Sequence, residues 1–575
     1  MASTSAFMSS LRTCAKKKDL YECNRLRAEA HRTGLFEAST YVGNMIITIY
    51  GQCGAVSEAR EVFGALPVRD LVSWNALVSA YARNGQAQEA LDCYEQMRSG
   101  GFIPDVITYT CILKACGIVG SFEWGITIHE DIAGQGFLGK DIMLDTALID
   151  MYAKCGALVR AQQLFEGLST QDLVSWSALI AGYVQHGRGE AALHCYSRMR
   201  QSGHSPDAIT YVCILKACSI TGAVDMGMQI HDEVVIKGLL GKIVALDTAL
   251  VDMYAHCGVL KKAREVFDKL KVRDVVAWSS FITGLSQEGQ TNDAMECFIR
   301  MRAEGHYPDD ITYTSILKAC SNIGAVDLGK QIHIEIISQR LLEKNIVLGN
   351  SLIDMYAKCG VPMKAQQVFD EFPEKTMISW SILVTGYAQQ GQVKTASKCF
   401  LEMCNKGLAP NIICWNALIG GYTQQGQIEK ALHCCQSMQE EGISPDNVTF
   451  VCLLHACSHL GLVDEGQIIF GAMEEIYGMT PSVEHFTCLT DLFGRSGLID
   501  KANSVINKMP FSDSSRVWCA LLGACQKTGD AKLGSVAFGH AVNFDEFDGV
   551  TYICMQNLCL SANLQVSEFS TLNFI

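Results

Sequence analysis

A tryptophan recurs every 102 residues along much of this chain. Trp74, Trp176, Trp278 and Trp380 hold this spacing inside Leu-Val-Ser-Trp-Asn and close variants, and Trp415 follows the fourth after 35 residues. A fixed period means that the same local structure is built many times and buried against its neighbours. A chain of 575 residues with this pattern predicts an elongated array instead of several separate globular domains.

Each period divides into three repeats of unequal length: intermediate repeats of 35 residues, long repeats of 36 and short repeats of 31. The first apolar stripe of the intermediate repeat 71–105 consists of Trp74, Leu77, Val78 and Tyr81. Their spacing of three and four residues is typical of one helix face, and the following Asn84-Gly85 ends that helix. A second apolar stripe follows in the same repeat, so every repeat is predicted to be a pair of helices. The predicted fold is all-α: a right-handed superhelical α-solenoid of helix-turn-helix repeats with a concave face.

Composition narrows the function classes. Nucleic-acid binders are usually basic, so the net charge of −14 counts against nucleic-acid binding without excluding it, and it predicts a shallow salt dependence for any such binding. The 26 cysteines follow the period, as Cys14, Cys116, Cys218 and Cys320 show, and no Cys-x-x-Cys pair occurs. We expect small buried thiols in a reducing compartment, with no metal and no cofactor. No apolar run reaches the roughly 18 residues of a membrane span, so no membrane partner is expected.

The repeat lengths and their core phrases resemble the PLS class of plant pentatricopeptide repeat (PPR) proteins. The phrases are Ile-Leu-Lys-Ala-Cys at 112–116 in a long repeat and Asp-Met-Tyr-Ala-Lys-Cys-Gly at 150–156 in a short one. The resemblance covers residues 4–565 and implies P-type (intermediate), L-type (long) and S-type (short) repeats. The implied domains are L and S repeats at 4–70, three P-L-S triplets at 71–376, two tandem P repeats at 377–446, closing L and S variants at 447–514, a partial E-like extension at 515–565 and an unassigned tail at 566–575.

The resemblance implies that the chain binds single-stranded RNA, one base per repeat. In the family, the fifth residue of a repeat and its last residue together read the base. The implied pairs are Asn44 with Asp70, Asn75 with Asp105, Thr146 with Asp172, Ser177 with Asp207, Thr248 with Asp274, Ser279 with Asp309, Asn350 with Thr376, Ser381 with Asn411, Asn416 with Asp446, and Thr487 with Ser514.

The family code assigns letters to most of these pairs. Asn with Asp favours U, Thr or Ser with Asp favours G, and Ser with Asn favours A. The pairs Asn350–Thr376 and Thr487–Ser514 depart from the code, and long repeats are left blank. The predicted site reads UU-x-GG-x-GG-x-n-A-U from 5′ to 3′. The alternative interpretation is that each aspartate merely caps the next helix.

Two further sets match RNA-facing places in the family. The second residues of the intermediate repeats, which would sandwich the bases, are Val72, Val174, Val276, Ile378 and Ile413. Basic residues near the ends of first helices, which would touch phosphates, are Arg83, Lys154, His256 and Lys358. The alternative interpretations are core residues for the first set and solvated charges for the second.

Catalysis is not expected. Many proteins of this class end in a DYW deaminase domain, whose signature is His-x-Glu followed by Cys-x-x-Cys. His333-Ile334-Glu335 matches the first half, but it lies inside a predicted helix and no Cys-x-x-Cys follows. The E-like region breaks off as if truncated, and no DYW domain is recognised. We therefore predict that the chain is not an enzyme and has no catalytic residues.

The leading functional hypothesis is a site-recognition factor for organellar C-to-U RNA editing, with a DYW-type deaminase or another editing factor supplied in trans. The alternatives are a factor for RNA stabilisation, splicing or translation and, in another class, a tetratricopeptide-like peptide-binding scaffold. No DNA partner is expected. The resemblance implies a mitochondrion or a chloroplast, with the mitochondrion slightly favoured, and residues 1–18 resemble a targeting peptide only faintly.

Overall fold

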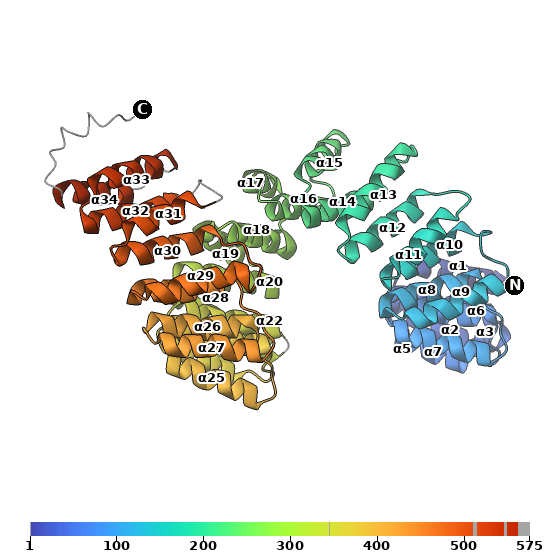
Figure 1. Ribbon diagram of the computed structural model, residues 1–575. Coiled ribbons are helices and arrows are strands. Elements are labelled where there is room, and N and C mark those ends of the chain that lie inside the picture. The colour runs from blue at the N-terminus through green and yellow to red at the C-terminus, as the bar shows by residue number, and fades with distance from the viewer. Residues whose placement is uncertain (1, 344, 510–514, 545–548, 562–575) are drawn as a thin grey trace. The chain divides into compact units, whose positions relative to one another are not determined.

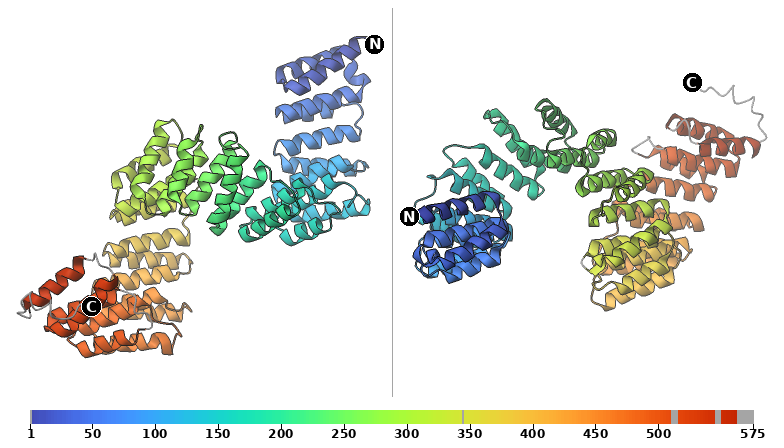
Figure 2. Two further views of the ribbon diagram at one scale, coloured as in Figure 1. Left: turned by 90° about the horizontal axis from the view of Figure 1, so that it is seen from above. Right: turned by 180° about the vertical axis from the view of Figure 1, so that it is seen from behind.

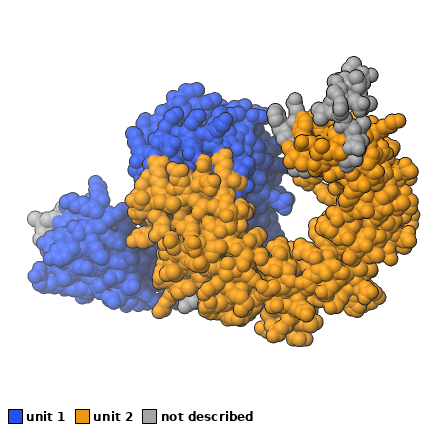
Figure 3. Space-filling view, turned by 90° about the vertical axis from the view of Figure 1, so that its left-hand side faces the viewer, with its two compact units in different colours: residues 1–288 blue, residues 289–575 orange. Residues whose placement is uncertain are grey.

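The computed structural model describes residues 2–343, 345–509, 515–544 and 549–561. The chain forms two compact units, residues 1–288 and residues 289–575 (Figure 3). Within the described ranges the regular structure consists of α-helices and one short 3-10 helix, with no strand (Figure 1). Consecutive helices pair and stack within each unit, so the predicted all-α solenoid of helical pairs is confirmed.

Unit 1 begins with α1 (Ala2–Lys17), α2 (Leu20–Arg32) and the short α3 (Leu35–Ala38). The first helices of its later repeats are α4 (Thr40–Cys53), α6 (Leu71–Arg83), α8 (Val106–Val119), α10 (Ile142–Lys154), α12 (Leu173–Gln185), α14 (Ala208–Thr221), α16 (Val244–His256) and α18 (Val275–Gln287). The second helices are α5 (Val56–Ala65), α7 (Ala87–Ser99), α9 (Phe122–Gly134), α11 (Leu158–Glu166), α13 (Gly189–Gln201), α15 (Val224–Ile236) and α17 (Leu260–Lys269). The left view of Figure 2 shows the N-terminal pairs of this unit stacked in sequence order.

Unit 2 begins with α19 (Thr291–Ala303). Its first helices are α20 (Asp310–Ile323), α22 (Ile346–Lys358), α24 (Met377–Gln389), α26 (Ile412–Gln424), α28 (Asn447–Leu460), α30 (Val483–Arg495) and α32 (Ser515–Thr528). The other helices are α21 (Val326–Ser338), the 3-10 helix η1 (Leu341–Glu343), α23 (Pro362–Glu371), α25 (Val393–Asn405), α27 (Ile428–Glu440), α29 (Val463–Glu475), α31 (Ile499–Asn507), α33 (Ala531–Phe544) and α34 (Gly549–Ser561). The tail predicted at 566–575 lies outside the described residues.

Helix ends follow from local sequence. Asp105 caps α8 by accepting a hydrogen bond from the backbone N–H of Thr108 at 2.9 Å, which satisfies a donor that the helix itself leaves free. Gly120 ends α8 in the left-handed region with φ of 73°, where a side chain would be strained. Because the same residue types return with the period, the caps return with it.

The first helices form one continuous layer within each unit. Within a unit, first helices pack on their own second helices and on neighbouring first helices, as α10 does with α11, α8 and α12. Gly182 of α12 allows this close approach, because a Cβ there would lie 2.3 Å from the Cβ of Ala153. Neighbouring second helices make few such contacts among the described residues. The first helices therefore make the inner layer on which the candidate site lies.

Tryptophans and cysteines occupy the core of this stack. Trp74 meets Phe63 edge-on with ring centroids 4.7 Å apart, and Trp176 meets Phe165 in the same way at 4.4 Å. Cys116 is fully buried, and burial raises the pKa of its thiol to about 12, so it stays a neutral apolar group. No helix among the described residues has the length and apolarity needed to cross a membrane.

Candidate nucleic-acid interface

The fifth residue of several first helices is hydrogen-bonded to the last residue of the same repeat. The amide nitrogen of Asn75 donates to both carboxylate oxygens of Asp105, at 3.0 and 2.9 Å. Asn416 donates to Asp446 at 2.9 Å in the same way. These residues are about 30 positions apart, and they meet because the aspartate that caps the next helix is also the neighbour of the asparagine.

A hydroxyl from the next helix completes this arrangement. The side chain of Thr449 donates to the carbonyl oxygen of Asn416 at 2.6 Å, and its backbone N–H donates to Asp446 at 2.9 Å. Thr108 bonds the Asn75 carbonyl oxygen and Asp105 in the same way. We call each set of asparagine, aspartate and threonine a clamp.

The clamp determines which way the amide points. Burial opposes ionisation of Asp446, but hydrogen bonds from Thr449 and Asn416 outweigh it and lower the pKa of this carboxyl. An ionised carboxylate only accepts, so the amide NH2 must face it and the carbonyl oxygen must face the threonine. Each asparagine then retains one N–H and one lone pair for an external partner.

The clamp of the first short repeat lacks one bond. Asn44 donates to Asp70 at 3.1 Å, but the hydroxyl of Ser73 turns to Asp70 at 2.8 Å. The carbonyl oxygen of Asn44 is buried without a hydrogen-bond partner. Burial raises the pKa of Asp70, yet its hydrogen bonds from Ser73 and Asn44 outweigh this effect and lower it overall.

The predicted threonine pairs are held less firmly than the asparagine clamps. Thr146 is 8% exposed, and its hydroxyl oxygen is buried without a hydrogen-bond partner. Asp172, its predicted partner, accepts from the backbone N–H of Ser175 at 2.8 Å. Thr248 and Asp274 are joined at the long distance of 3.4 Å.

The predicted serine pairs are arranged differently. Ser177 reaches Asp207 indirectly, because its hydroxyl bonds that of Thr210 at 2.8 Å and Thr210 donates to Asp207 at 2.7 Å. Ser279 belongs to unit 1, where it is buried in α18, whereas Asp309 belongs to unit 2, where it caps α20.

The remaining predicted pairs follow no common pattern. The hydroxyl of Ser381 donates to the backbone carbonyl of Met377 at 2.8 Å and lies 3.3 Å from the side-chain oxygen of Asn411. That oxygen accepts from the backbone N–H of Cys414 at 3.0 Å, so the amide nitrogen of Asn411 is left as a donor. Asn350 accepts from Ser379 at 2.7 Å, and Thr376 also bonds Ser379, at 3.1 Å. The hydroxyl of Thr487 donates to its own helix at Val483, and its predicted partner Ser514 lies outside the described residues.

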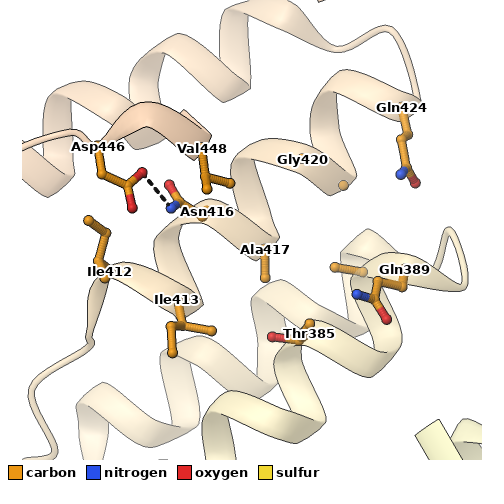
Figure 4. Close-up of a pocket in the computed structure, with 12 residues that line it drawn as sticks. Thr385, Gln389, Ile412, Ile413, Asn416, Ala417, Gly420, Gln424, Asp446 and Val448 are labelled. Atoms are coloured by element: carbon orange, nitrogen blue, oxygen red, sulfur yellow. Dashed lines mark hydrogen bonds between the residues drawn. The ribbon is translucent and has the colours of Figure 1, made fainter. Parts of the chain in front are cut away.

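Three hollows coincide with predicted base-reading residues. The first, of about 360 Å³, contains Asn416 and Asp446 between Ile413 and Val448 (Figure 4). The second, of about 210 Å³, contains Asn75 between Val72 and Ile107. The third, of about 240 Å³, contains Ser381 and Asn411 between Ile378 and Ile413. A predicted polar pair thus lies in the first and third hollows and Asn75 alone in the second, each between two aliphatic side chains that we call the walls.

The aliphatic walls are exposed and do not belong to the core. Val72 is 57% exposed, Ile107 60%, Ile413 55% and Val448 55%. Val174, Val276 and Ile378 are exposed in the same register. Sequence reasoning named the second residues of the intermediate repeats but missed the exposed second residues of the long ones, which are Ile107, Ile209, Ile311 and Val448. Of these, Ile107 and Val448 line hollows. The signal was present, because each is the second residue of its repeat.

The clamp hydroxyls were also missed by sequence reasoning. Thr108 and Thr449 each lie three residues after the aspartate that they help to hold. An Asp-x-x-Thr pattern is a recognisable helix start. The additional hydrogen bond from the threonine to an asparagine about 33 residues earlier depends on how two helices pack.

The four residues predicted to contact RNA phosphates differ in whether an aspartate is already bound to them. Lys154 is paired with Asp150 at 2.7 Å and Lys358 with Asp354 at 2.8 Å, each one helical turn apart. His256 lies 3.2 Å from Asp252, and its hydrogen bond to that carboxylate raises the pKa of the imidazole. Arg83 is exposed beside the second hollow and makes no hydrogen bond or ion pair within the described ranges.

The long repeats form no clamp. Thr110 and Thr314 return their hydroxyls to their own helices at 2.7 and 2.8 Å, and Val212 at the same position has no hydrogen-bonding group. The residue that would supply the clamp hydroxyl is a buried leucine after three of these repeats: Leu144, Leu246 and Leu348.

The residues suggestive of catalysis have a structural role. His333 is half-buried in α21 and shares a hydrogen bond of 3.1 Å with the hydroxyl of Tyr356. His129 with Tyr152 and His231 with Tyr254 repeat this contact. Among the described residues no cluster of three or more His, Cys, Asp or Glu side chains is arranged to hold a metal.

Paired helices, stacked so that first helices carry a regular row of polar pairs, define a helical-repeat binding protein. Sequence signatures confirm this class and specify it. The PPR repeat family matches residues 69–117, 171–219, 273–322 and 410–459, and the pentatricopeptide repeat domain matches residues 374–425. PPR repeats are also matched at 248–275, 350–376, 448–476 and 484–513. The chain belongs to the pentatricopeptide repeat family.

Curated relatives are similar over most of this chain. A pentatricopeptide repeat-containing protein of Arabidopsis thaliana is 32% identical over 90% of this chain and 70% of its own length. A chloroplastic member from the same plant is 32% identical over 95% of this chain and 58% of its own length. A mitochondrial member is 29% identical over 96% and 75%. The chain therefore spans between 58% and 75% of the lengths of these relatives.

Solved structures share the fold at low sequence identity. The crystal structure of the pentatricopeptide repeat protein PPR10 in complex with an 18-nt psaJ RNA element aligns with a TM-score of 0.54 and 17% identity. The alignment covers 98% of this chain and 90% of that one. The structure of PPR10 from maize aligns with a TM-score of 0.50 and 18% identity over 98% and 88%.

Proposed function

We propose that this protein binds single-stranded RNA in a plant organelle and reads bases one at a time with its intermediate and short repeats. The observation that carries the proposal is the lining of the hollows, in which one or both residues of a predicted pair lie between two exposed aliphatic walls. An unstacked base has a flat apolar face and a polar edge, and RNA-binding modules recognise both features. The crystallised relative PPR10 was solved with an RNA element.

The chemistry of the clamp favours uracil. Asn416 keeps a free N–H beside a free carbonyl lone pair, because its other groups are held by Asp446 and Thr449. The Watson–Crick edge of uracil presents an N–H donor beside a carbonyl acceptor, which is the complementary order. Such paired hydrogen bonds discriminate by about 1–3 kcal/mol per base.

The other pairs favour purines. A threonine hydroxyl beside a carboxylate, as at Thr146 and Asp172, offers an acceptor for the two N–H donors of guanine and a donor for its carbonyl. Beside Ser381 the amide nitrogen of Asn411 offers a donor to the ring nitrogen of adenine. The proposed site is therefore UU-x-GG-x-GG-x-n-A-U.

We further propose that the bound RNA is a substrate for C-to-U editing by a deaminase on another chain. The order of intermediate, long and short repeats supports this proposal through its resemblance to editing factors. Chloroplastic and mitochondrial relatives support an organelle as the location. A plant that lacks the protein should leave one or a few organellar cytidines unedited. Complete editing of every transcript in such a plant would contradict the editing role.

RNA binding itself is tested with purified protein. Fluorescence anisotropy should show tighter binding of an RNA with the proposed sequence than of a scrambled RNA of equal composition. The expected difference is at least 100-fold, because several bases each contribute about 1 kcal/mol or more. Equal affinity for the two RNAs would contradict base reading.

A further inference from the structure

The ninth residue of the first helices faces the hollows. Thr385 and Gly420 hold this position in the repeats that form the first hollow, and both line it (Figure 4). Thr48 and Ser79 hold it around the second hollow and line that one. The position follows the fifth residue by one helical turn, so the two residues share a face.

In three long repeats the ninth residue is a lysine. Lys114, Lys216 and Lys318 are all exposed, and they recur with the 102-residue period. None makes a hydrogen bond or ion pair to any residue that the structure describes. Each is therefore a solvated cation at the helix position that, in other repeats, faces the hollows.

In the short repeat that follows a long repeat, an aspartate is paired with a lysine near the same helix position, and the two charges cancel. The ninth residue of the short repeat 142–172 is Asp150, and it binds Lys154 at 2.7 Å. Asp354 binds Lys358 at 2.8 Å in the third triplet. An external phosphate would have to compete with these carboxylates for the two short-repeat lysines, whereas no such competition exists at the long-repeat lysines.

In the middle triplet the equivalent pair is Asp252 with His256, and Lys216 lies close enough to influence it. Burial opposes ionisation of Asp252, while its hydrogen bond from His256 and the positive charge of Lys216 help to lower the pKa of its carboxyl. The junction between a long and a short repeat thus carries a carboxylate with a basic partner, and one additional unpaired lysine.

We propose that Lys114, Lys216 and Lys318 bind backbone phosphates of the RNA at the positions whose bases the long repeats do not read. This inference rests on the proposed function and assigns the long repeats a task within it. Between two base-reading repeats the RNA must pass one long repeat, and a fixed cation there holds its backbone without regard to sequence.

The long repeat 447–482 has a different ninth residue and is not part of the proposal. His455 holds the position, and its ring nitrogen lies 3.1 Å from that of His459 one turn later. Arg495 of the next repeat reaches His459 at 3.4 Å and also binds Asp491.

The test is the salt dependence of RNA affinity in the full chain. Anisotropy titrations over a series of KCl concentrations would use an RNA carrying UU-x-GG-x-GG-x-n-A-U and its scrambled counterpart. Each phosphate contact on a single strand contributes about 0.7 to the slope of log affinity against log salt. The K114Q/K216Q/K318Q variant should lose about 2 from this slope, and the corresponding triple arginine variant should keep it.

Two matched variants separate paired from unpaired cations. K154Q/K358Q should change the slope by less than half as much per residue, because these lysines are already neutralised by aspartates. D150N/D354N should raise the slope and the affinity, because it releases both lysines. Thermal melting by circular dichroism verifies that the exposed substitutions leave the fold intact.

The outcomes distinguish this inference from the proposed function. A triple glutamine variant with an unchanged slope and an unchanged preference for the proposed RNA would overturn the lysine assignment alone. A lowered slope without any preference between the two RNAs would support the lysines and overturn base reading. Absence of binding to either RNA by the unmodified protein would overturn both.

Discussion

Two junctions in unit 1 contain similar residues but differ in geometry. At the end of the intermediate repeat 71–105, Asp105 holds Asn75 and is itself held by Thr108. At the end of the long repeat 106–141, Asp141 caps α10 through the backbone N–H groups of Met143 and Leu144, at 2.9 and 3.3 Å. Thr110, at the fifth position of that repeat, bonds its own helix. No hydrogen bond joins Thr110 to Asp141 among the described residues.

The comparison shows that residue identity at two positions does not by itself bring the two side chains together. Thr110 and Asp141 have the same residue types as the predicted guanine pair Thr146 and Asp172. The long repeat has one additional residue before its last aspartate, and the third residue of the following helix is Leu144, which has no hydroxyl. The clamp requires three residues in register, and the long repeat has only part of the set.

The largest expected effect is a switch of base preference at a clamp. Asn75→Thr should change the preference at one base from U toward G by about 1–3 kcal/mol, because a hydroxyl beside Asp105 replaces the amide donor and acceptor. Anisotropy on RNA pairs that differ at this base measures the switch. The matched control is Thr110→Asn in the long repeat, which should leave all preferences unchanged. A new preference for U at the long repeat would show that base reading does not require the complete clamp.

The next effect is the loss of an aliphatic wall. Ile413 borders two hollows, so Ile413→Ser should weaken binding at two adjacent bases by about 2 kcal/mol in total, close to 30-fold, whatever their sequence. Ile103→Ser, at an exposed isoleucine that lines none of the three hollows, is the control. Equal losses in the two variants would show that the walls are not specific contacts.

A smaller effect is expected when the clamp hydroxyl is removed. Thr108→Val leaves the Asp105 cap on the backbone N–H but frees the carbonyl oxygen of Asn75. The discrimination for U at this base should fall by about 1 kcal/mol, the net value of one hydrogen bond. Binding of RNAs that vary at this base tests the prediction. A variant that keeps full discrimination would show that only the asparagine and the aspartate of the clamp contribute.

The smallest expected effect is a pH dependence of stability, which arises from histidines in three of the long repeats. Burial lowers the pKa of His129, His231 and His333, which bond tyrosines of the next repeat. The folded state favours the neutral imidazoles, so these histidines contribute their whole stabilising free energy above the pKa of the unfolded state, about 6.5. That contribution is lost as pH falls through their lower pKa values in the folded state. The melting temperature should therefore decrease between neutral pH and about pH 5.

A control for this pH dependence exists in the chain. The long repeat 447–482 has Phe470 where the others have histidine. Replacing the three histidines by phenylalanine should make the melting temperature less dependent on pH over this range. If the triple variant melts with the same pH dependence as the unmodified protein, the titration belongs to other groups.

The sequence by itself determined the elements and their order. The 102-residue period, the helical stripe around Trp74 and the aspartates that begin α6, α8 and α12 are local patterns, and local patterns decide where helices start and end. The fifth and last residues of the repeats were also identified from the sequence, through a family resemblance. The pairing of Lys154 with Asp150 lies within one helical turn and was readable in the same way.

Only the tertiary structure decided which of these residues act together. Thr108 bonds a residue 33 positions earlier, Asn75, because two rigid first helices pack at a fixed register. The walls of a hollow come from two successive repeats, as Ile413 and Val448 do. Whether Lys114 has a partner depends on every helix that surrounds it. The capping and hydrophobic patterns that fix each helix carry no information on these distances, which packing between helices sets.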